Sequence, residues 1–66
     1  MKYKIIGDSV SGHCCFECSV IDVTKIQYKE GYVVAETFNQ ESAILICIAL
    51  NKLEGFGEVY EFTTED

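Results

Sequence analysis

Proline is absent from this chain of 66 residues, so glycine must mark the turns and helix ends. No apolar run approaches the roughly 18 residues that cross a bilayer, and the longest extends only from Ala43 to Leu50. Near the start of the chain, Gly7-Asp8 interrupts the apolar pair Ile5-Ile6, so no signal-peptide core forms. We therefore expect a cytoplasmic protein that does not contact the membrane.

Positive charge is scarce, and it is unevenly distributed. The net charge is −6; residues 1–29 carry four lysines and three acidic residues, whereas residues 30–66 carry one lysine and eight acidic residues. The acidic half disfavours direct contact with nucleic-acid phosphates. It would be attracted to a protein with a basic surface. A solvated face that only keeps the protein soluble would have the same composition, so both interpretations stay open.

The length predicts a single domain, residues 1–66. A chain of this size buries only about 60% of the surface that its unfolded form exposes. Domains this small usually need a disulfide, a metal ion or a partner for stability.

Alternation of apolar and polar residues predicts strands at Tyr3 to Ile6, His13 to Lys25, Tyr32 to Phe38 and Glu58 to Thr63. Before the last strand, Asn39 occupies an N-cap position, and a helix is predicted from Gln40 to Leu53. Gly55 and Gly57 then end the helix. The predicted fold is α+β, with an antiparallel sheet of three to four strands, one helix packed on one face, and the order β-β-β-α-β.

The predicted helix has more apolar surface than one sheet can cover. At about 100° per residue, one stripe faces the sheet and consists of Ala43, Ile46, Cys47, Leu50 and Leu53. Ile44, Leu45 and Ile48 then point outward. Either the C-terminal segment with Phe56, Tyr60 and Phe62 covers them, or they form an interface. We favour the interface, as a docking patch for another protein or as a homodimer through the helix.

The segment His13-Cys14-Cys15-Phe16-Glu17-Cys18 contains the donor types that bind zinc. On a strand, however, Cys15 and Cys18 point to opposite faces. We therefore expect Cys14, Cys18 and Cys47 to be small buried hydrophobic residues in a reducing compartment. A metal site of His13, Cys15 and Cys18 is the alternative, and it requires the strand to break at Cys15. No cofactor is expected.

Catalytic patterns do not stand out in the sequence. It contains neither a glycine-rich phosphate loop nor a serine in an elbow motif. The glutamates fall mostly at outward positions or turns rather than as an inward-facing pair. We therefore predict that the protein is not an enzyme.

Two blocks of the sequence resemble a family of small uncharacterised bacteriophage proteins. The first is Gly12-His13-Cys14-Cys15-Phe16-Glu17 followed by Ser19-Val20-Ile21-Asp22, and the second consists of 36–39, 42–43 and 49–51. The chain departs from the family pattern at Cys18 and Thr37, where a small residue and a cysteine are expected. The resemblance implies a phage or prophage accessory protein, in the cytoplasm of the host cell. Small acidic proteins of that kind often block host defence, including CRISPR effectors.

The sequence and the resemblance together predict a phage-type inhibitor that binds a host protein, such as a CRISPR or other defence effector. The predicted partner-binding residues are Ile44, Leu45, Ile48, Glu58 and Glu61. One alternative is a zinc- or redox-responsive protein that uses His13, Cys15 and Cys18. Another is a small-molecule sponge with a pocket formed at a dimer seam.

Overall fold

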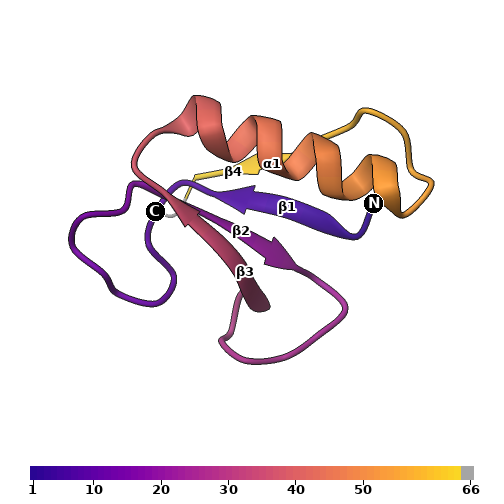
Figure 1. Cartoon of the computed structure of the whole chain (residues 1–66). Helices are drawn as coiled ribbons and strands as arrows, with labels where there is room; N and C mark the ends of the chain where they lie inside the picture. The colour runs from indigo at the N-terminus through magenta and orange to yellow at the C-terminus, as the bar shows by residue number, and fades with distance from the viewer. Residues whose placement is uncertain (65–66) are drawn as a thin grey trace.

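The computed structural model describes residues 1–64, with one helix lying on a four-stranded sheet (Figure 1). The elements are β1 (Tyr3–Ile6), β2 (Cys18–Asp22), β3 (Tyr32–Thr37), α1 (Gln40–Leu53) and β4 (Phe62–Thr63). The predicted α+β class and element order are therefore confirmed. Within the described residues, no helix has the length and apolar character needed to span a membrane.

The sheet is mixed, and the prediction of a wholly antiparallel sheet is wrong. Its order is β3-β2-β1-β4; β2 is antiparallel to both β1 and β3, whereas β1 and β4 are parallel. Since β1 and β3 both oppose β2, they run in the same direction. The helix α1 returns the chain to the end where β3 began, so β4 runs in that direction too (Figure 1). A strand added at either edge after such a helix must be parallel to its neighbour.

The helix α1 has the predicted bounds and caps. The Asn39 side chain accepts a hydrogen bond from the Ser42 N–H at 2.8 Å, which satisfies one of the unpaired donors in the first turn. At the other end, Gly55 has a φ of 86°, a conformation that favours glycine. The N–H of Gly55 donates to the carbonyl of Lys52, which closes the last turn.

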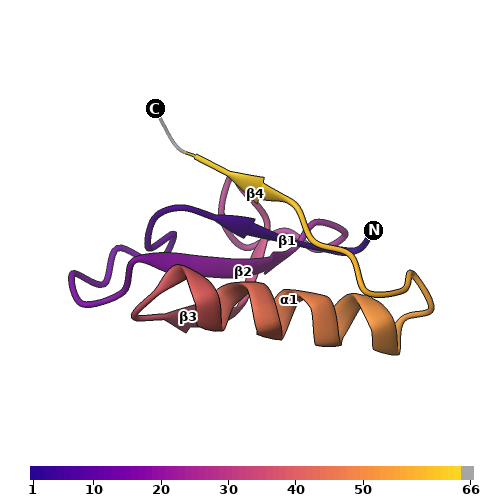
Figure 2. The same cartoon turned by 90° about the horizontal axis from the view of Figure 1, so that it is seen from above.

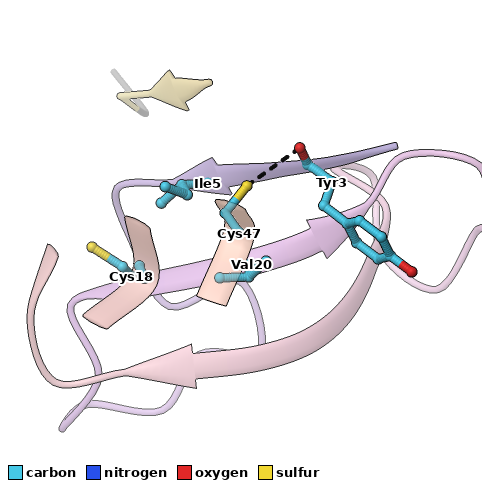
Figure 3. Packing of buried hydrophobic residues seen from close by; sticks show 6 residues of the cluster. Tyr3, Ile5, Cys18, Val20 and Cys47 are labelled. Atoms are coloured by element: carbon cyan, nitrogen blue, oxygen red, sulfur yellow. Dashed lines mark hydrogen bonds between the residues drawn. The ribbon is translucent and has the colours of Figure 1, made fainter. Parts of the chain in front are cut away.

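The core lies between α1 and the sheet. In Figure 3, Ile5 and Val20 of the sheet lie beside Cys47 of the helix, and all three are fully buried. The helix contributes small side chains here, Ala43 and Cys47, so its backbone can approach the sheet closely. Each buried Ile or Val side chain stabilises the fold by roughly 1.5–3 kcal/mol.

Asn51 is a fully buried polar residue of α1, and it joins the helix to two other segments. Its Oδ1 accepts from the N–H groups of Tyr3 and Lys2, at 2.9 and 3.2 Å. Its Nδ2 donates to the carbonyls of Tyr3 and Val59, both at 3.0 Å. One side chain therefore fixes the helix against β1 and against the segment that leads into β4.

Loops cover the opposite face of the sheet. Ile6, Ser19 and Ile21 are buried although their neighbours Ile5 and Val20 point toward the helix. The loop 7–17 covers this face, and the backbone N–H of Val10 in this loop donates to the Ser19 hydroxyl at 2.8 Å. Gly31, at the end of the loop between β2 and β3, packs so closely that an added Cβ would lie 2.9 Å from the Asp22 carbonyl oxygen.

Three strands are shorter than predicted. The predicted strand from His13 to Lys25 is a strand only at Cys18–Asp22, and residues 13–17 belong to the loop. The third strand ends at Thr37, one residue before its predicted end. The last strand is limited to Phe62–Thr63, because the chain pairs with β1 only there (Figure 2).

Candidate protein-binding surface

The outward side of α1 carries an uncovered apolar stripe. Leu45, Ala49 and Leu53 follow one another at intervals of four residues, which places them on one side of the helix. Leu45 is 70% exposed and Leu53 is 83% exposed. We call these three residues the outer stripe.

The three residues that were expected to point outward do not all do so. Leu45 points outward, as predicted, whereas Ile44 packs against the core and Ile48 is half-buried. Leu53 was expected to face the sheet, and this expectation is wrong. The helix is rotated about its axis relative to the expected orientation, because Asn51 is buried on the side that faces the sheet. The expected orientation was based on apolar residues alone and left Asn51 out.

The C-terminal segment does not cover the outer stripe. Phe62 packs against the core from its place in β4, and Phe56 and Tyr60 are themselves 49% and 46% exposed. Figure 2 shows why: the chain leaves the end of α1 and runs back along β1, at the edge of the sheet farthest from β3. The alternative that the C-terminal segment covers the outward residues is therefore wrong for Leu45, whereas Ile44 and Ile48 are half-buried.

Two carboxylates, Glu41 and Glu58, lie close to the outer stripe. Glu41 in the first turn of α1 is exposed, and Glu58 forms an ion pair with Lys52 of the helix at 3.4 Å. Glu61 lies farther away, beside β1 and just before β4; it is exposed and makes no ion pair within residues 1–64. Since Lys52 offsets Glu58, Glu61 is the stronger of the two as a source of negative potential.

A polar cluster around Glu36 holds the loop between β1 and β2 in place. The Glu36 carboxylate accepts hydrogen bonds from the hydroxyls of Ser9 at 2.8 Å, Ser19 at 2.6 Å and Ser11. Burial acts to raise the pKa of Glu36, but these hydrogen bonds favour the charged form more strongly, so the pKa is lowered. A hollow beside this cluster is lined by Asp8, Ser9, Val10 and Glu30.

The four cysteines are free thiols in two different environments. Cys18 and Cys47 are buried, as predicted, and burial raises the pKa of both thiols. Cys14 was expected to be buried with them, but it is exposed, as is Cys15. The reason is that the chain is a loop at residues 13–17, so strand alternation does not apply there.

The alternative metal site is not assembled. The strand does break before Cys18, yet Cys15 is exposed in the loop whereas Cys18 lies in the core. Among residues 1–64, no three His, Cys, Asp or Glu side chains gather closely enough to hold a metal ion.

The comparisons with known proteins add no relative. No protein-family model matches the chain, and no match was found among curated proteins or among solved structures. The resemblance of residues 12–51 to small phage proteins therefore stays a prediction.

Sequence reasoning missed two features of these surfaces. The Glu36 cluster joins residues that are 17 to 27 positions apart, and isolated serines give no signal of such a contact. The exposure of Leu53 follows from the burial of Asn51, which the sequence does not show. A polar residue that is fully buried rotates the inner side of the helix toward itself.

Proposed function

We propose that this protein works by binding another protein, through the outer stripe of α1 and the carboxylates beside it. The observation that supports this most is the 70% exposure of Leu45 together with the 83% exposure of Leu53 on the same helix. Large apolar side chains that cluster at a protein surface usually mark an interaction site. An exposed helix stripe of this kind fits an apolar groove of a partner.

Charge favours a partner of a different kind over a second copy of this chain. Each copy has a net charge of −6, so two copies repel one another. A partner with basic residues around an apolar groove would be attracted instead, which raises the association rate. We therefore propose a protein with a basic surface as the occupant. Homodimerisation through the helix is the competing outcome.

The proposed partner class is a host defence protein, such as a CRISPR effector, which the chain would inhibit. This finer proposal depends on the resemblance to small phage proteins in residues 12–51. It assigns no catalytic role to any residue, because binding alone would block the partner.

Capture experiments with the wild-type protein and two variants test the proposal. Tagged wild-type protein, Leu45→Asp and Ile26→Asp are each incubated with a bacterial lysate, and bound proteins are quantified by mass spectrometry. Ile26 is the matched control, because it is apolar and 95% exposed but lies in the loop after β2. We expect a protein that wild type and Ile26→Asp retain and that Leu45→Asp loses. Equal capture by all three, or concentration-dependent dimerisation that Leu45→Asp abolishes, would refute the proposal.

A further inference from the structure

The tip of the loop between β1 and β2 presents two adjacent thiols to solvent. The Sγ atoms of Cys14 and Cys15 lie 3.9 Å apart, and both residues are exposed. Two bonds of about 2.3 Å, the length of a zinc–thiolate bond, span at most about 4.6 Å, so a single ion of similar size can contact both sulfurs. The two sulfurs are therefore already close to the separation that one bound metal ion requires.

Contacts on each side hold the tip in place. The Ser9 hydroxyl accepts from the His13 N–H at 2.8 Å, and it also donates to the Glu36 carboxylate. The Phe16 ring lies 4.6 Å from the His13 ring and 5.0 Å from that of Phe38, which precedes the helix. Figure 1 shows this loop at the end of the molecule where α1 begins. The thiols are thus carried by a loop that is tied to both β3 and the start of the helix.

The number of donor atoms near Cys14 and Cys15 limits which metal ions could bind there. Structural zinc sites almost always have four protein ligands, and residues 1–64 offer no cluster of three donors. Nδ1 of His13 accepts the Cys15 N–H at 3.3 Å, so that nitrogen is occupied. Two thiolates without a third side chain suit a soft ion of low coordination number, and thiolate is the ligand that Cu(I) prefers.

We propose that Cys14 and Cys15 form a two-thiolate site for a soft monovalent metal ion, Cu(I). Each thiol loses its proton when it binds the ion, and the copper stays Cu(I) throughout, so no oxidant or reductant is needed. This site is separate from the outer stripe and does not depend on the protein-binding proposal. It also differs from the set of His13, Cys15 and Cys18, because Cys18 lies in the core.

An anaerobic titration with Cu(I) against a coloured competing chelator tests the site. We expect the wild-type protein to retain about one Cu(I) per chain, with thiolate-to-copper absorption in the near ultraviolet. The double variant Cys14→Ser, Cys15→Ser should lose this binding entirely, although it keeps Cys18 and Cys47. His13→Ala, the matched control, should keep it. Unchanged binding by the double variant, equal loss in His13→Ala, or no binding by the wild type would overturn the proposal.

A second measurement needs no copper and probes the thiol pair in the native chain. A trivalent organic arsenical bridges two neighbouring thiols, and the adduct is counted by intact mass. We expect one adduct on the wild-type protein and none on Cys14→Ser, with the fold of both confirmed by amide NMR spectra. A wild-type protein that forms no adduct, or a variant that forms it equally, would show that the two sulfurs do not act as a pair.

Discussion

Glu36 and Asn51 connect the loops and termini of this small fold to its sheet and helix. Neither adds to the apolar core, yet each makes contacts that connect segments far apart in the sequence. Hydrogen bonds to a charged group are stronger than neutral ones, and a buried group that loses its partner is costly. These two side chains therefore give the chain some of the stability that a disulfide gives to other small domains.

Replacing Glu36 by Gln should destabilise the protein by about 1–3 kcal/mol at neutral pH. The amide keeps the size of the side chain but removes the charge that three serine hydroxyls stabilise. Urea denaturation of wild type, Glu36→Gln and the exposed control Glu17→Gln measures the difference. Equal losses in the two variants would mean that the serine cluster contributes nothing specific.

The contribution of Glu36 should also depend on pH. Its pKa in the folded protein is lowered from the ordinary value of 4.5. A lowered pKa stabilises the folded state above the unfolded pKa, and this stabilisation disappears as the pH falls through the folded pKa. The stability gap between wild type and Glu36→Gln should therefore narrow in acid, below about pH 4.5. A gap that stays constant from neutral pH into strong acid would contradict the lowered pKa.

Asn51→Ala tests the second polar contact. The change leaves the buried Tyr3 N–H and the partly exposed Val59 carbonyl without their partner, and a buried group that loses its partner costs roughly 1–3 kcal/mol. Lys52→Ala, at the next position, is the control, because an exposed ion pair contributes at most about 1 kcal/mol. Thermal unfolding should show a clear loss for Asn51→Ala. A melting temperature equal to that of the control would show that Asn51 is not needed to join helix and strand.

At the scale of elements, local signals predicted the helix well and the strands poorly. Asn39 and Gly55 determine the helix ends through contacts within a few residues, so the sequence was sufficient there. The strands end where pairing ends, and pairing depends on distant residues. The alternation at His13 to Glu17 resembles a strand, but those residues are held in a loop by Ser9 and Phe38 instead. The parallel pairing of β4 could have been predicted from the directions of β1 and β3.

The outward and inward sides of α1 should respond differently to the same substitution. Leu45→Asp should change the free energy of unfolding by less than about 1 kcal/mol, chiefly through helix propensity. Ile44→Asp should destabilise by more than about 2 kcal/mol, because it places a charge beside the core. Urea denaturation of the two variants gives both values. Comparable losses would indicate that Leu45 is covered in solution.

At the scale of the whole molecule, the acidic surface should influence the rate of partner binding. Glu61→Gln should slow association with the captured partner and weaken its dependence on salt, because exposed charges act mainly on the association rate. Glu58→Gln should have the smaller effect, since Lys52 already offsets that carboxylate. Surface plasmon resonance at several salt concentrations measures both. Association rates equal to that of the wild type in both variants would exclude steering by these charges.

The central claim is that the outer stripe of α1 contacts another protein. A photo-crosslinking amino acid placed at position 45, and in a control at position 26, tests this contact in living bacterial cells. Both side chains are exposed, but only Leu45 belongs to the stripe. We predict a discrete heterologous adduct from position 45 and none from position 26. The same adduct from both positions, an adduct only with a second copy of the chain, or no adduct from position 45 would contradict the claim.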